Sequence, residues 1–137
     1  LVLLFSIRLF FKEGRVSVKI LVVDDTAFMR IRLQKILTAA GHEVIQAENA
    51  SVALTIYQEQ KPDLVTMDIT MPEIDGIKAI SLLRRLDPEA KVIVISAMGQ
   101  KSMVGEAIKA GAKDFVVKPF EPERIVAAVS RAARQIK

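Results

Sequence analysis

The amino-acid sequence predicts an α/β protein, a doubly wound five-stranded parallel sheet with five helices on its two faces. Five short runs rich in Val, Ile and Leu recur along the chain, and stretches with helical spacing of apolar residues lie between them. Regular alternation of strands and helices is typical of right-handed crossovers between parallel strands. Nearly continuous apolar runs favour the same fold, because such strands are buried on both sides.

The predicted strands are short, and four of them end directly before an aspartate, a serine or a lysine. Their side chains are aliphatic in the main, as expected when only 5% of the residues are aromatic. The five strands are predicted at Ile20–Val23, Val44–Ala47, Leu64–Met67, Val92–Ile95 and Phe115–Val117.

Each strand is followed by a predicted helix. Gly41 and Gly111 are in the expected position to end the first and fourth helices. Pro62 and Pro88 end the second and third, because the residue before a proline disfavours helical geometry. The fifth starts near Pro122 and reaches the C-terminus. The apolar residues expected to face the core are Met29, Leu33, Ile36 and Ala40, then Val52 and Ile56, then Ile77, Ile80 and Leu83, then Val104, Ala107 and Ile108, then Ile125, Val129, Ala132 and Ile136.

The first seventeen residues differ from the rest. Leu1–Phe11 is an apolar run with one arginine, shorter than the about 20 residues of a membrane-spanning helix and without the features of a signal peptide. Two interpretations stay open. The residues before about Val16 are translated upstream sequence, with Val16 or Val18 as the natural start, or the run is a weak anchor for a membrane or a partner. We therefore expect residues 1–17 to be an extension that is not native or is disordered, and we expect no membrane insertion.

Composition excludes several classes of site. The 137 residues suffice for one domain with a buried core. The absence of cysteine excludes disulfides and thiolate metal sites and gives no argument for secretion. The single histidine, His42, lies in a Gly-His-Glu turn and is expected to be a solvated loop residue. A net charge of +4, spread along the chain, does not support a nucleic-acid partner.

Three aspartates stand where predicted strands end: Asp24 and Asp25 after the first and Asp68 after the third. Ligands of open parallel sheets bind beyond the carboxyl ends of the strands, so these side chains are expected to converge. Carboxylates this close repel one another unless a cation joins them. Mg²⁺ suits the site because it takes carboxylate and phosphate oxygens. We expect one of the paired acids, Asp68 and a backbone carbonyl of the following turn as direct ligands.

Lys118 and Ser96 end the fifth and fourth strands at the same edge. A lysine can neutralise charge and hold a phosphoryl oxygen, and a serine can donate a hydrogen bond to it. No histidine base is available to make Ser96 a nucleophile. A carboxylate can be the nucleophile instead, and Asp68 is preferred because the other groups flank it.

The order of these motifs resembles the receiver domain of two-component response regulators. The residues that carry the resemblance are Asp-Asp, then MDITMPEIDG, then Ser-Ala and then Lys-Pro-Phe. VDDTAFMR and SAMGQKSMVGEAIKAGAKDFVVKPF resemble stand-alone chemotaxis regulators in particular. The resemblance implies a flavodoxin-like (CheY-like) sheet of strand order 2-1-3-4-5, one receiver domain over residues 18–137 and a cytoplasmic location.

The resemblance also implies residue roles. Asp68 would accept a phosphoryl group from a sensor histidine kinase. Asp25 would bind Mg²⁺ directly, Asp24 through water and Thr70 through its backbone carbonyl. Lys118 would contact the phosphoryl group, and Ser96 would move toward it.

Phe115 corresponds to the switch aromatic of the family, where many chemotaxis regulators have tyrosine. Thr70 and Met98 stand where the family tunes dephosphorylation, and Met98 cannot orient a water, so we predict a long-lived phosphoryl group. The expected output surface is the face of helix four, strand five and helix five, with a downstream protein such as a flagellar motor switch component as partner. Basic residues able to contact an acidic partner there are Arg124, Arg131, Arg134 and Lys137.

Four alternatives remain. A single-domain phosphorelay intermediate would pass the phosphoryl group onward without an output surface. An aspartyl-phosphate phosphatase usually has its nucleophile on an early strand with a second acid two residues on, but Asp68 ends the third and precedes Ile69-Thr70. A flavodoxin would need a hydroxyl- and glycine-rich loop where this chain has DDTAF. A DNA-binding regulator would need residues beyond the fifth helix. We expect a regulator that assists its own phosphorylation and dephosphorylation, not an enzyme.

Overall fold

The computed structural model describes residues 10–12, 15–70 and 75–134. Its main sheet has five parallel strands in the order β4-β3-β5-β6-β7, which is order 2-1-3-4-5 along these five strands. The predicted sheet is therefore confirmed, with strand boundaries within one residue of those expected. The strands are β3 (Lys19–Val23), β4 (Glu43–Ala47), β5 (Leu64–Met67), β6 (Val92–Ser96) and β7 (Asp114–Val117).

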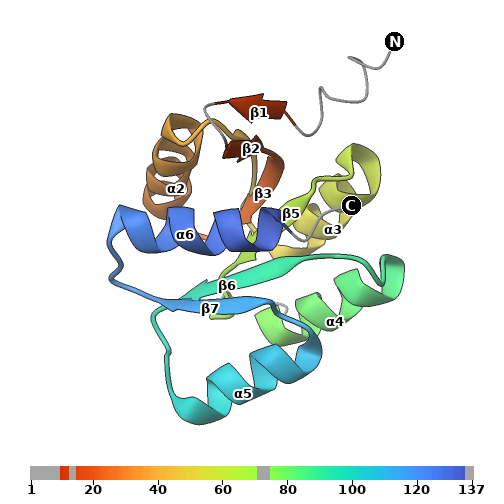
Figure 1. The fold of residues 1–137 in the computed structure, drawn as a ribbon. Coiled ribbons are helices and arrows are strands. Elements are labelled where there is room, and N and C mark those ends of the chain that lie inside the picture. Colours follow the sequence, from red (N-terminus) through yellow and green to blue (C-terminus); the bar gives the residue numbers. More distant parts are fainter. Residues whose placement is uncertain (1–9, 13–14, 71–74, 135–137) are drawn as a thin grey trace.

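Five helices cover the two faces of this sheet (Figure 1). Side chains of α2 and α6 pack with one set of buried strand residues, and those of α3, α4 and α5 pack with the other. The three central strands thus lie buried between two apolar layers. The helices are α2 (Ala27–Ala39), α3 (Ala50–Gln60), α4 (Gly76–Leu86), α5 (Lys101–Ala110) and α6 (Pro122–Ala133).

The predicted helix stops have the expected backbone geometry. Gly41 and Gly111 have φ of 96° and 119°, a region that glycine enters without a steric penalty. Lys61 takes a left-handed φ of 48° directly before Pro62. Asn49 and Asp75 cap α3 and α4 by accepting hydrogen bonds from backbone N–H groups.

Part of the expected N-terminal extension has strand structure. β1 (Phe10–Lys12) and β2 (Arg15–Ser17) pair antiparallel, with Phe10 opposite Ser17. The other residues of the extension lie outside the described residues, as do Ile136 and Lys137. That the extension is not part of the natural protein stays a prediction, which N-terminal sequencing of natively expressed protein tests.

The prediction for His42 was wrong. The residue is buried, with 7% of its surface exposed. Its Nδ1 accepts a hydrogen bond of 3.2 Å from the backbone N–H of Val18, which precedes β3. The turn lies against a strand start 24 residues earlier in the chain, and this contact turns an expected solvated side chain into a buried one.

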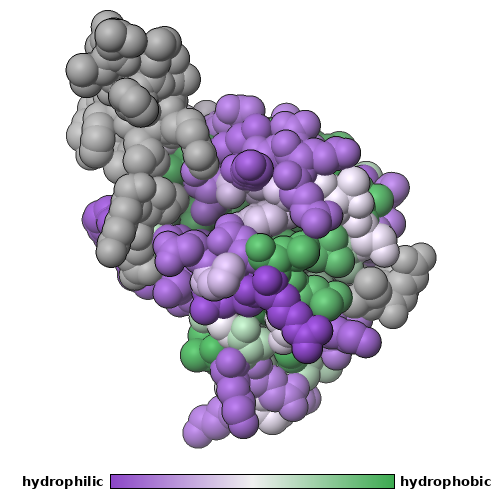
Figure 2. All heavy atoms as spheres, turned by 90° about the vertical axis from the view of Figure 1, so that its right-hand side faces the viewer, coloured by the Kyte–Doolittle hydropathy of each residue, from purple (hydrophilic) through white to green (hydrophobic). Residues whose placement is uncertain are grey.

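The side of the molecule where the parallel strands begin faces the viewer in Figure 2 and shows a hydrophobic area framed by hydrophilic side chains. In the described part of the chain, no helix combines the length and the apolar character needed to cross a bilayer.

Candidate functional site

The three aspartates meet at the carboxyl edge of the sheet, as predicted. Carboxylate oxygens of Asp24, Asp25 and Asp68 lie within 4.8 Å of one another. The parallel pairing of β3 and β5 produces this, because Val23 is in register with Met67 and the next residues are Asp24 and Asp68. The Asp68 N–H donates to the Val23 carbonyl at 3.1 Å and continues the ladder into the site.

Lys118 connects the two buried carboxylates. Asp24 and Asp68 are 1% and 4% exposed, and the Lys118 Nζ lies 2.9 Å from Asp24 Oδ2 and 3.3 Å from Asp68 Oδ2. Burial acts to lower the pKa of Lys118, but the hydrogen bond to Asp24 and the charge of Asp68 outweigh it and raise the pKa above its usual value. The ammonium is therefore held in its charged form. The Lys118–Pro119 peptide bond is cis.

Each of the two buried aspartates is held by a threonine two residues further along the chain, in a short turn of the same kind. Thr26 donates its N–H and its hydroxyl to Asp24 Oδ1, each at 2.9 Å. Thr70 donates the same two groups to Asp68 Oδ1, at 2.9 and 2.7 Å. Sequence reasoning missed this role of the two threonines, although an Asp-X-Thr spacing directly after two strands is a signal for it.

Asp25 differs from its neighbours. Its side chain is exposed, and it has no hydrogen-bond or ion-pair partner among the residues that the structure describes. It therefore offers both oxygens to a ligand at the mouth of the site, while Asp24 and Asp68 each use both oxygens within the protein.

Ser96 ends β6, the strand between Asp68 on one side and Lys118 on the other. It is fully buried, its carbonyl accepts from the Lys118 N–H at 2.8 Å, and its hydroxyl oxygen accepts from the Met98 N–H at 3.1 Å. The Met98 side chain is 41% exposed at this edge.

Gly76, the first residue of α4, packs against the backbone that carries Asp68. A Cβ at this position would lie 2.3 Å from Ile69 Cα and 2.7 Å from the Asp68 carbonyl oxygen. Only glycine allows this approach, so the start of α4 packs directly on the Asp68 backbone and helps to fix its position.

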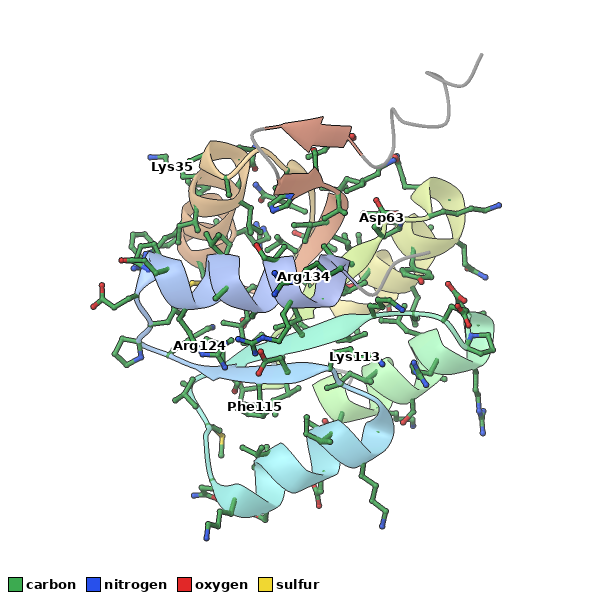
Figure 3. The ribbon with its side chains drawn as sticks, in the orientation of Figure 1. Lys35, Asp63, Lys113, Phe115, Arg124 and Arg134 are labelled. Carbon is green, nitrogen blue, oxygen red and sulfur yellow. The ribbon has the colours of Figure 1, made fainter. Side chains whose placement is uncertain are left out.

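Phe115 is buried in the apolar layer shared with α4 and α5, on the side of β7 away from α6 (Figure 3). On the α6 side, Arg124 donates to both carboxylate oxygens of Asp114 and to the Phe115 carbonyl at 3.2 Å. Arg131 also pairs with Asp114, at 3.4 Å. Two of the basic residues predicted for partner binding thus have a partner within the chain, while Arg134 is exposed.

Burial acts to raise the pKa of Asp114, but the hydrogen bonds from Arg124 and from the Phe115 N–H prevail and lower it. The carboxylate therefore stays charged and keeps β7 joined to α6.

The donor set at the carboxyl edge fits Mg²⁺, which prefers a few carboxylate oxygens together with phosphate oxygens and water. A closely spaced, largely buried acid cluster that shares one lysine retains excess negative charge, which a divalent cation would balance. Fold and site together define a class, an α/β protein with an acidic, lysine-containing site at the carboxyl edge of a flavodoxin-like sheet.

Comparison with known proteins gives the family. The model of the response regulator receiver domain matches residues 20–130. The chemotaxis protein CheY of Thermotoga maritima is 57% identical over 117 residues, which are 85% of this chain and 98% of that protein. CheY of Bacillus subtilis is 54% identical over 114 residues, 82% of this chain and 95% of that protein. The chain belongs to the response regulator receiver domain family.

A solved structure agrees. A chain in the CheX–CheY–BeF₃–Mg²⁺ complex of Borrelia burgdorferi superposes with a TM-score of 0.81 and 35% identity, over 90% of this chain and 92% of that one. Fold, family and relatives confirm the predicted receiver fold and the role of a chemotaxis response regulator.

Proposed function

We propose that this response regulator accepts a phosphoryl group on Asp68 from the phosphohistidine of a sensor kinase in the cytoplasm. Mg²⁺ would be held by Asp25, Asp68 and the Thr70 backbone carbonyl, and by Asp24 through water. When bound, the ion supplies charge neutralisation for the phosphoryl oxygens. The observation that carries the proposal is the Lys118 ammonium seated between Asp24 and Asp68 at the carboxyl edge.

In the transfer, an oxygen of the Asp68 carboxylate attacks phosphorus in line, the P–O bond forms and the P–N bond to the donor histidine breaks. The imidazole leaves with the electron pair of that bond and takes up a proton. Lys118 is placed to hold a phosphoryl oxygen, since it already contacts the nucleophilic carboxylate at 3.3 Å. The two hydrogen bonds from Thr70 orient Asp68 and leave positioning as the main task of the protein.

The reverse of activation is hydrolysis. Water attacks phosphorus, the P–O bond to Asp68 breaks, and inorganic phosphate leaves with the carboxylate restored. The same residues would assist this step, so the protein would take part in its own dephosphorylation. The exposed positions Thr70 and Met98 border the path of the water, and neither side chain is a base.

For output, we propose that the phosphoryl group draws the Ser96 hydroxyl away from the Met98 N–H and that Phe115 follows. The two elements are linked directly, because the Ser96 carbonyl accepts from Lys118 and β6 pairs with β7 along Ile93–Ser96. A partner that binds one of the two arrangements better would shift the population toward it. The relatives named for chemotaxis and the complex with CheX support a protein partner, which we propose is a flagellar motor component at the α5, β7 and α6 face.

The test is incorporation of phosphate from acetyl phosphate, with and without Mg²⁺, into wild type and Asp68→Asn. We expect labelling that needs Mg²⁺ and is lost in the variant, because asparagine keeps the shape and lacks the nucleophile. Wild type that takes up no label, or Asp68→Asn that labels as well as wild type, would refute the proposal.

A further inference from the structure

One cation near the acid cluster has no part in the chemistry proposed above. Arg30 lies on the first turns of α2 and is half-buried. Its Nη1 donates to the backbone carbonyl of Asp24 at 2.8 Å, and its Nε donates to Gln46 Oε1 at 3.2 Å. The guanidinium therefore bridges the turn after β3 and the neighbouring edge strand β4.

The bonded carbonyl belongs to the peptide unit that joins Asp24 to Asp25. The N–H at the other end of Asp24 donates to the Ala47 carbonyl on β4 at 3.2 Å, and the Asp24 carboxylate is held by Thr26 and Lys118. With Arg30 on the carbonyl, every polar group of Asp24 is bonded. The plane of the peptide that leads into Asp25 is thereby fixed.

Asp25 itself has no side-chain partner in the described part of the chain, so its direction depends on its backbone. The guanidinium is braced from behind, because the Gln46 amide that accepts from Nε also donates to Gln34 on α2. A planar fork with two fixed acceptors can hold a peptide plane in a way that a single ammonium cannot.

We propose that Arg30 is a positioning residue for the cation site, which holds the Asp24–Asp25 peptide so that the exposed Asp25 carboxylate points at a bound Mg²⁺. The inference rests on the proposed function. Positioning by Arg30 would strengthen Mg²⁺ binding, whereas its positive charge would weaken Mg²⁺ binding. A positive side chain beside the site repels Mg²⁺, so charge alone predicts tighter binding when Arg30 is removed, whereas loss of positioning predicts weaker binding.

The sign is measured by calorimetric titration of the unphosphorylated full chain with Mg²⁺. We expect Arg30→Ala to raise the dissociation constant about tenfold, the lower end of what loss of a residue that orients a metal ligand causes. Lys35→Ala is the matched control, since it removes one positive charge from the exposed side of the same helix and should leave the constant within about twofold. Equal or tighter binding by Arg30→Ala overturns the inference.

Folding of the metal-free Arg30→Ala variant is checked by urea titration in the presence of EDTA. If that variant is not folded, two further variants keep the test decisive. Arg30→Lys keeps the charge but not the fork, and Gln46→Leu removes the brace and leaves Arg30 in place. Both should raise the Mg²⁺ dissociation constant above that of wild type, by less than about tenfold. Wild-type affinity in both would overturn the inference.

A second readout separates positioning from general damage. In the acetyl phosphate assay, the Mg²⁺ concentration for half-maximal labelling should rise in Arg30→Ala, while the rate at saturating Mg²⁺ stays within about twofold. A lower saturating rate with an unchanged half-maximal concentration would contradict positioning. Wild type that binds no Mg²⁺ would instead refute the proposed function, which keeps the two failures apart.

Discussion

The edge of the sheet where the parallel strands begin and the edge where they end use polar residues in opposite ways. Where the strands begin, backbone N–H groups donate to side chains from other segments of the chain: the Val18 N–H to His42 Nδ1, and the Lys19 N–H to Asp63 Oδ2 at 2.9 Å. Where the strands end, Asp24 and Asp68 share the one ammonium of Lys118. Figure 3 labels Asp63 at the first edge, well away from the end of β7 that leads to Lys118.

The difference separates stability from function. A buried polar group with its own partner adds to the free energy of unfolding, and losing the partner is costly. Clustered carboxylates with too few cations oppose one another and gain from an added cation. At the first edge, the two backbone N–H groups named above thus have acceptors among the described residues, whereas under the proposed function the second edge would be completed by Mg²⁺ and a phosphoryl group. Variants at each edge should therefore differ in what they change.

The largest effect is expected where α4 meets the site. In Gly76→Ala the new Cβ would meet backbone atoms of Asp68 and Ile69 that no side-chain rotation relieves. We expect a loss of about 3 kcal/mol of unfolding free energy in urea titrations, together with slower labelling by acetyl phosphate. Gly105→Ala in α5 is the control, because its Cβ meets nothing within 4 Å, and it should stabilise by about 0.5–1 kcal/mol. A neutral Gly76→Ala would contradict the packing argument.

At the other edge, His42→Ala should lower the unfolding free energy by about 2 kcal/mol and leave the labelling rate unchanged. The variant leaves the buried Val18 N–H without its acceptor and removes a buried ring. His42→Asn, which retains an acceptor near the same place, should lose less. If His42→Ala were labelled more slowly than wild type under conditions where it is fully folded, the assignment of stability to one edge and function to the other would be wrong.

Met98 should affect chemistry alone. Met98→Gln or Met98→Glu places a group that can orient water next to the phosphoryl group, so label should decay several-fold faster. The unfolding free energy should stay within about 0.5 kcal/mol, because the side chain is 41% exposed. The loss of label is followed after removal of the phosphodonor. An unchanged decay in both variants would argue against the predicted long lifetime of the wild-type phosphoryl group.

The smallest effect is expected at Asp114, which lies in neither edge cluster. Its folded-state pKa is lowered, so its ion pairs with Arg124 and Arg131 stabilise the fold above the unfolded pKa near 3.8, and this is lost as pH falls through the folded pKa. Because the arginines are largely exposed, Asp114→Asn should cost less than about 1 kcal/mol at pH 7, and the difference should vanish in acid. Glu106→Gln, which removes the charge of an exposed carboxylate on α5, is the control for the loss of one negative charge.

Periodicity and stop signals were enough to predict the sheet. The parallel direction and the strand ends followed from apolar runs such as Val92–Ile95 and the helical stretches between them, and glycines at 41 and 111 ended helices as expected. The strand order came from the resemblance to receiver domains instead. The meeting of Asp24, Asp25 and Asp68 also followed, because residues after neighbouring parallel strands must share an edge.

Contacts between distant residues could not be predicted in this way. His42 was misjudged because its partner Val18 is 24 residues away and lies beside it only in the folded sheet. Arg30 gave no signal, since an arginine on a helix is usually solvated and its acceptors come from two other segments, Asp24 in the turn after β3 and Gln46 on β4. The pairing of Arg124 and Arg131 with Asp114 was missed for the same reason.

The most direct test of the contrast between the edges is urea unfolding of wild type and Asp25→Asn with and without Mg²⁺. Asp25 is exposed and has no side-chain partner in the described residues, so its replacement leaves the protein's own contacts intact. At a Mg²⁺ concentration about 100 times the dissociation constant of wild type, the unfolding free energy of wild type should rise by about 2.7 kcal/mol. The unfolding free energy of Asp25→Asn should rise far less. No gain in wild type, or an equal gain in both proteins, would contradict the account.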